Sequence, residues 1–146
     1  MKRVKNFVIL LIIIIIIVTV SVPIINNYYA YRIEMQLCET PLPEETEIID
    51  SVSKAGKLVG NGNGMQYFGG ILIKSSLSLE TLREYYSGFK KDEWSYIVEH
   101  QEGPSVDWIE NGTISFSKAV EGDNYYIVYS WGTGNSLLSE IDFRGH

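Results

Sequence analysis

Few residues of this chain could carry nucleophilic catalysis. A serine or cysteine nucleophile needs a base beside it, and the only histidines are His100 and His146. His100 is expected at a strand end beside Glu99 and Glu102, where a surface histidine is ordinary, and no G-x-S-x-G motif occurs. We therefore predict no catalytic residue. An enzyme such as a hydrolase is the alternative, because Asp107 and many serines leave a triad open.

Metal and cofactor sites are not indicated either. Zinc requires three or four His, Cys or carboxylate ligands at suitable spacing, and the sequence contains neither such a set nor a D-x-D-x-D-G calcium loop. The glycine-rich run 60–64 precedes an expected strand rather than a helix, which is typical of a hairpin connection and not of a phosphate site. We predict no cofactor and no metal, and interpret the densest acidic cluster as a solvated face: Glu44, Glu45, Glu47 and Asp50.

Aromatic residues are the one unusual feature of the composition, at 12% of the chain. Large rings bury much area each, so most of them are expected to fill a small core. Aromatic side chains on the free face of a sheet could instead bind a partner. Phe68 and Tyr126 alternate out of phase with their expected core neighbours. With Trp108, they are our candidates for a binding surface.

An uncharged apolar run, FVILLIIIIIIVTVSVPII, covers residues 7–25. As a helix it would be roughly 28 Å long, close to the ~30 Å hydrocarbon thickness of a bilayer. Residues 1–6 contain Lys2, Arg3 and Lys5, which favour a cytoplasmic N-terminus and place the rest of the chain outside. The sequence therefore predicts a single-pass protein of the cell membrane.

A cleaved signal peptide, which would give a secreted protein, is the rival interpretation. The apolar run is longer than the roughly 7–15 residues of a signal h-region. The possible cleavage sites are also poor, because Pro23 closely follows the triplet 19–21 and the triplet 28–30 begins with a bulky tyrosine. We therefore favour a retained anchor.

Residues 26–43 are expected to form a juxtamembrane stalk, which Pro41 and Pro43 end. Residues 44–146 then form one domain outside the membrane, which we expect to fold without the stalk. The chain after Asn26 contains nine basic and eighteen acidic residues, a formal charge of −9. This charge argues against binding nucleic acid. Cys38, the only cysteine, is interpreted as a spectator thiol, with a disulfide to another chain as the alternative.

Periodicity predicts an α+β domain in the order β-β-α-β-β-β. The expected strands cover 48–59, 65–75, 94–101, 113–120 and 125–131. The helix begins after the N-cap Ser78, with Leu82, Tyr86 and Phe89 on its inner face. We expect this helix to pack on one face of an antiparallel sheet, giving two layers.

The stretch from Ala55 through the glycine run 60–64 to Glu80 resembles a pattern in small, uncharacterised single-pass membrane proteins of Gram-positive bacteria. The resemblance covers less than a fifth of the chain and implies a bacterial envelope protein, without any activity or site residue. Together with the anchor, it leads us to expect a non-enzymatic interaction domain. An envelope protein, a toxin or a wall polymer is the expected partner.

Overall fold

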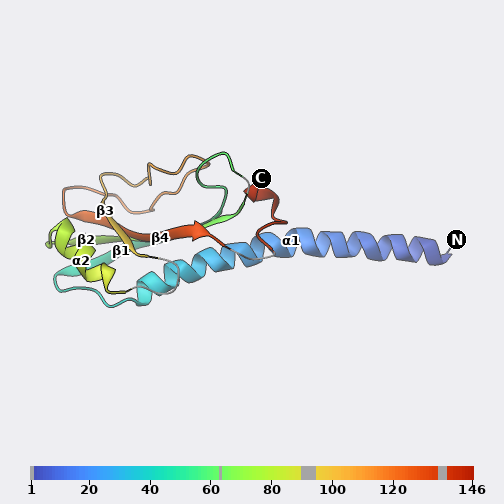
Figure 1. Ribbon diagram of the computed structural model, residues 1–146, viewed down its shortest axis with the longest axis horizontal. Coiled ribbons are helices and arrows are strands. Elements are labelled where there is room, and N and C mark those ends of the chain that lie inside the picture. Colours follow the sequence, from blue (N-terminus) through green and yellow to red (C-terminus); the bar gives the residue numbers. More distant parts are fainter. Residues whose placement is uncertain (1, 63, 90–94, 135–137) are drawn as a thin grey trace.

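The computed structural model describes residues 2–62, 64–89, 95–134 and 138–146. A single 38-residue helix, α1 (Lys2–Glu39), opens the chain, and its first half stands free of the rest of the molecule (Figure 1). The second half lies along an antiparallel sheet formed by β1 (Thr46–Gly56), β2 (Gln66–Ser75), β3 (Ile97–His100) and β4 (Tyr125–Thr133), in the order β1-β2-β4-β3.

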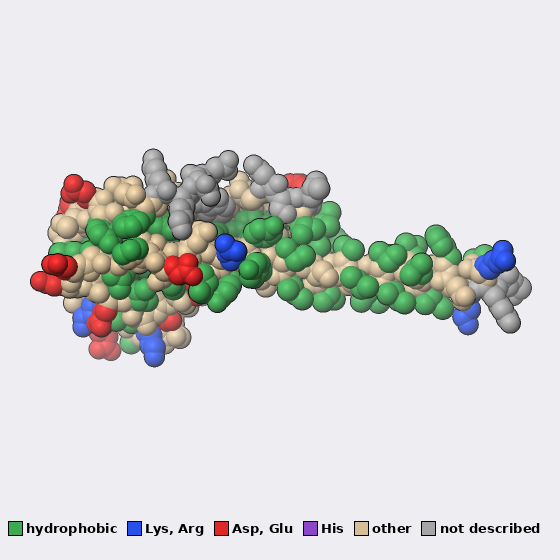
Figure 2. Space-filling view, turned by 90° about the horizontal axis from the view of Figure 1, so that it is seen from below, with side chains coloured by type: hydrophobic (Ala, Val, Ile, Leu, Met, Phe, Trp, Pro, Cys, Tyr) green, Lys and Arg blue, Asp and Glu red, His purple; other side chains and the backbone are tan. Residues whose placement is uncertain are grey.

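Helix α1 is long and apolar enough to cross a membrane, with Pro23 inside it. Every side chain from Arg3 to Val20 is exposed. Figure 2 shows hydrophobic side chains along this free rod, lysine and arginine at its tip, and acidic side chains near the opposite end of the molecule. A helix that is apolar all round and has no protein neighbour is typical of a segment surrounded by lipid.

The second half of α1 differs from the expected stalk. Val22, Asn26, Ala30 and Leu37 are buried at 4% exposure or less, and their spacing of four and seven places them on one side of the helix. Leu37 belongs to the apolar cluster of the domain, which it shares with Ile71 of β2. The expected boundary between residues 43 and 44 therefore falls within one packed unit.

Helix α2 (Leu79–Ser87) lies on the same face of the sheet as α1. The Ser78 hydroxyl accepts a hydrogen bond from the Thr81 N–H at 3.2 Å, which confirms the expected N-cap. Leu82 and Tyr86 are fully buried, as predicted. Phe89 lies beyond the end of the helix and is only partly buried.

The opposite face of the sheet is covered by the long segment 101–124, most of which is irregular (Figure 1). A strand over 113–120 was expected, and this prediction is wrong: the segment makes one isolated bridge, between Ser105 and Ser115. Ile114 and Phe116 do point inward, at 2% and 4% exposure. Alternating burial in this segment comes from packing on the face of the sheet, and it does not require a neighbouring strand.

Asp50 of β1 holds this irregular segment in place. Its carboxylate accepts hydrogen bonds from the Ser117 N–H at 2.6 Å, the Ser117 hydroxyl at 2.8 Å and the Lys118 N–H at 3.1 Å. Burial alone would raise the pKa of Asp50, but these bonds and one from the Ser51 N–H lower it overall. The expected two layers are therefore wrong: in the described part of the chain, the domain has a layer of two helices, a four-stranded sheet and a loop layer on the opposite face.

Three of the expected strands match strands of the sheet, and a fourth is shorter than expected. The expected strands 48–59, 65–75 and 125–131 correspond to β1, β2 and β4. Strand β1 lies at an edge of the sheet and ends at Gly56. The strand 94–101 is shorter, as β3, and Trp94 lies outside the described residues. The chain ends in a short 3₁₀ helix, η1 (Phe143–Gly145).

Candidate functional site

The histidines are not placed for catalysis. The Nε2 atom of His100 lies 2.6 Å from the carbonyl oxygen of Asp123, and that of His146 lies 3.0 Å from the carbonyl oxygen of Glu140. Among the described residues, both rings therefore contact backbone carbonyls, and neither is hydrogen-bonded to a serine or cysteine. Within the described ranges, no group of three or more His, Cys, Asp or Glu side chains could hold a metal ion.

Cys38 is partly buried where α1 packs on the sheet. Burial is the largest cause that raises the pKa of its thiol, and the nearby carboxylates of Glu34 and Glu39 add to it. A hydrogen bond involving Ser51 acts in the opposite direction. This environment therefore disfavours the thiolate, which is the reactive form of a cysteine.

The three aromatic binding candidates do not lie together on one surface. Phe68 is fully buried, and its ring lies 5.8 Å from the rings of both Trp108 and Tyr129, measured between centroids. Tyr126 lies on the opposite, helix-covered face, where its hydroxyl donates to the Leu77 carbonyl at 3.1 Å. Trp108 alone of the three is partly exposed.

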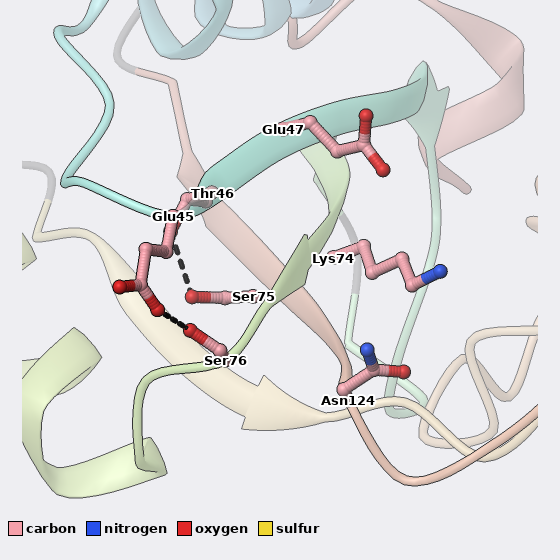
Figure 3. A pocket seen from close by; sticks show the side chains of 7 residues that line it. All are labelled: Glu45, Thr46, Glu47, Lys74, Ser75, Ser76 and Asn124. Atoms are coloured by element: carbon pink, nitrogen blue, oxygen red, sulfur yellow. Dashed lines mark hydrogen bonds between the residues drawn. The ribbon is translucent and has the colours of Figure 1, made fainter.

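A shallow hollow of about 440 Å³ lies where β1 begins and β2 ends, at the end of the domain opposite the free half of α1 (Figure 1), and Figure 3 shows the residues that line it. Glu47 and Lys74 are paired across β1 and β2 and both line it, so a carboxylate and an ammonium group are available to a polar ligand. The Lys74 nitrogen also lies 5.7 Å from the centre of the Tyr125 ring. Five further residues complete the lining: Glu45, Thr46, Ser75, Ser76 and Asn124.

The hydroxyl groups of this hollow are engaged within the protein. The Ser75 and Thr46 hydroxyls lie 2.7 Å apart, and the Ser75 oxygen also accepts from the Leu77 N–H at 3.2 Å. The Ser76 hydroxyl donates to the Glu45 carboxylate (Figure 3). No histidine lines the hollow. The arrangement suits recognition of polar groups better than activation of a nucleophile.

A polar cluster joins α1 to the rest of the domain; Asn26, Tyr67 and Asp142 are buried in it, and the exposed Arg144 completes it. The Asn26 side chain, which is fully buried, accepts from the Tyr67 hydroxyl at 2.7 Å and donates to the Asp142 carboxylate at 2.7 Å. The Arg144 guanidinium donates to both oxygens of Asp142, at 3.0 and 2.8 Å. This two-point pairing is the strong geometry for an arginine and a carboxylate.

The charges of this junction cluster are stabilised by their partners. Hydrogen bonds from Arg144, assisted by Asn26, lower the pKa of Asp142 to about 2 despite its burial. Burial, assisted by the nearby Asp142 carboxylate, raises the pKa of Tyr67 to about 12. Asp142 is therefore ionised and Tyr67 is protonated at neutral pH. These protonation states agree with the hydrogen bonds, in which the Asp142 carboxylate accepts and the Tyr67 hydroxyl donates.

Two glycines allow α1 and the C-terminal tail to approach the sheet and the β1–β2 loop closely. A Cβ atom added at Gly69 would lie 2.5 Å from the Glu34 backbone nitrogen and 2.8 Å from the Ile33 Cβ. A Cβ at Gly145 would lie 2.9 Å from the backbone of Gly64. The helix and the tail therefore rest directly on other backbone segments.

Sequence reasoning missed this junction cluster, although signals for it are present. An asparagine follows the apolar run directly, and Val22, Asn26 and Ala30 recur every four residues. A glycine inside a strand, as at Gly69, also indicates close approach of another backbone. Asp142 and Arg144 had no such signal, because their partners on α1 lie more than a hundred residues away in the sequence.

No protein-family model, curated protein or solved structure matches this chain.

Proposed function

We propose that this chain is a single-pass membrane protein that holds a small, non-enzymatic interaction domain outside the cytoplasmic membrane. One observation carries the proposal: α1 is a continuous helix whose first half is exposed and apolar on all sides and whose second half forms a layer of the domain. The uncharged apolar run 7–25, which is exposed up to Val20, is about 28 Å long as a helix and suits a hydrocarbon layer of ~30 Å.

The geometry also favours retention of the anchor over cleavage. The two weak cleavage triplets, 19–21 and 28–30, both lie within α1. Ala30, which ends the second triplet, is 1% exposed and packs with Tyr67. Cleavage after it would remove Asn26 and with it the centre of the junction cluster.

Orientation follows from the basic residues at the free tip of α1. Lys2, Arg3 and Lys5 favour the cytoplasmic side, so the domain lies outside. Protease added to intact protoplasts is expected to digest the domain, and carbonate washing is expected to leave the full chain in the membrane. A domain that resists protease until the protoplasts are lysed, or a chain that carbonate releases, would overturn the proposal.

The surface offered to a partner is the end of the domain farthest from the anchor. The hollow of Figure 3 lies there, with Glu47 and Lys74 accessible to a polar ligand. An envelope protein, a toxin or a wall polymer could be recognised by such a surface. The resemblance to envelope proteins of Gram-positive bacteria favours these partners over any cytoplasmic one.

Photo-crosslinking in intact cells tests this surface. A photoreactive residue at Glu47 is expected to capture a specific partner. The same group at the exposed Thr113, beside Lys54 near the other end of β1, serves as the control. Equal capture at both positions, or none at Glu47, would contradict binding at the distal end.

A further inference from the structure

The C-terminal tail is docked against α1 where the apolar run ends. The Arg144 guanidinium donates to the Pro23 carbonyl at 3.1 Å and to the Asn27 side chain at 2.8 Å. Figure 1 shows the C-terminus beside α1 near the point where the helix leaves the domain. Residues 23–27 straddle the outer end of the run, which closes at Ile25.

The tail holds two apolar side chains outward. Phe143 is 80% exposed and Ile141 is 50% exposed. Both neighbours of Phe143 are fixed: Asp142 is 2% exposed within the junction cluster, and the Arg144 carbonyl accepts from the Lys57 N–H at 3.0 Å. The exposure of Phe143 is therefore a property of a well-held backbone and not of a frayed end.

The depth of the tail follows from the length of the helix. If the run 7–25 fills the hydrocarbon, Ile25 lies at its outer boundary and the next turn lies in the interfacial layer. Any group docked on residues 23–27 then lies at that same depth. Aromatic side chains favour this layer, and the exposed Tyr28 and Tyr29 of α1 lie at the same level.

We propose that Ile141 and Phe143 insert into the outer interfacial layer of the membrane, so that the domain rests on the lipid surface through its C-terminal tail. This inference rests on the proposed membrane anchoring. The contact is local, because the net charge of −9 after Asn26 disfavours a domain lying flat on anionic lipid. The exposed Glu140 beside the tail stays at the level of the headgroups.

Quenching by spin-labelled lipid tests the proposal. The full chain carrying Cys38→Ser is reconstituted in phosphatidylcholine vesicles, and a single environment-sensitive dye is attached through Phe143→Cys or, separately, Ile141→Cys. Glu121→Cys, an exposed residue at the distal end, is the matched control. A quencher placed near the headgroups is expected to reduce the emission at both tail positions several-fold and to leave the control unchanged.

The outcomes separate the two proposals. A chain that carbonate washing leaves in the vesicles, but whose two tail positions are not quenched, would overturn the tail contact and leave the anchor in place. Equal quenching at the tail and at position 121 would also overturn it, because the whole domain would then lie on the membrane. Release of the chain by carbonate would overturn the anchor and the tail contact together.

Discussion

The two halves of α1 form one helix but have different surroundings. From Arg3 to Val20 every side chain is exposed, and no side of the helix is distinguished from another. From Val22 onward one side is buried against β1, β2 and the C-terminal tail, while Tyr28, Tyr29 and Tyr31 on other sides stay exposed. One helix can therefore combine a free apolar segment, long enough to cross a membrane, with a layer of the folded domain.

The largest expected effect contrasts a side chain from each half. Leu37 is fully buried in the domain, whereas Ile14 is 48% exposed on the free rod. Truncating a buried leucine commonly costs about 2–5 kcal/mol, so Leu37→Ala should lower the free energy of unfolding by that amount. Ile14→Ala should change it by about 0.5 kcal/mol or less. Chemical denaturation of both variants of the full chain in detergent micelles measures the two changes in the free energy of unfolding. Equal losses for Leu37→Ala and Ile14→Ala would contradict the packing of the second half of α1 in the domain.

A second contrast tests how closely the inner half approaches the sheet. Gly69→Ala places a methyl group 2.5 Å from the Glu34 backbone nitrogen, so the helix must shift. We expect a loss of about 1–3 kcal/mol, as for other overpacked sites. Gly56→Ala is the matched control, because nothing lies within 4 Å of its added Cβ. Thermal unfolding of both variants checks the prediction, and a tolerated Gly69→Ala would show that the helix is not seated on β2.

A third prediction concerns the junction cluster and acid. The pKa of Asp142 is about 2 in the folded protein, below its ordinary value of 3.8. The ionised carboxylate therefore stabilises the fold above about pH 4, and this contribution of about 2 kcal/mol is lost as the pH falls towards 2. Asp142→Asn should remove that part of the acid dependence.

Parallel denaturation curves at about pH 5 and about pH 2 test this prediction, since these values bracket the expected loss. Asn27→Ala is the control, because it removes a partner of Arg144 but keeps the carboxylate. If Asp142→Asn and the unaltered chain lose equal free energy of unfolding between the two pH values, the pKa of Asp142 is not lowered by Arg144 and Asn26.

The sequence predicted the elements whose signals are local. Ser78 and the spacing of Leu82 and Tyr86 identified α2, and alternation identified β2 and β4. Alternation failed over 113–120, because burial against a sheet face gives the same pattern as membership of the sheet. The aromatic candidates were placed by the same alternation, which cannot show that a loop layer covers Phe68.

The role of residues 26–39 was missed for a different reason. Pro41 and Pro43 do end the helix, but the end of a helix does not by itself mark a boundary between a stalk and a domain. Whether a helix packs on the sheet beyond the break is decided by contacts between distant residues, such as Asn26 with Asp142. The local signals for such contacts are weak: the small residue Gly69 in a strand, and Asn26 directly after the apolar run.

Two truncated chains test most directly whether the inner half of α1 belongs to the domain. A chain of residues 21–146 keeps the buried side of the helix and loses only the free rod, whereas a chain of residues 41–146 loses Leu37, Ala30 and Asn26 as well. Thermal unfolding followed by circular dichroism should give a cooperative transition for the first chain and none for the second. A transition of residues 41–146 at the same midpoint as that of residues 21–146 would contradict the account, because the helix would then be a dispensable stalk.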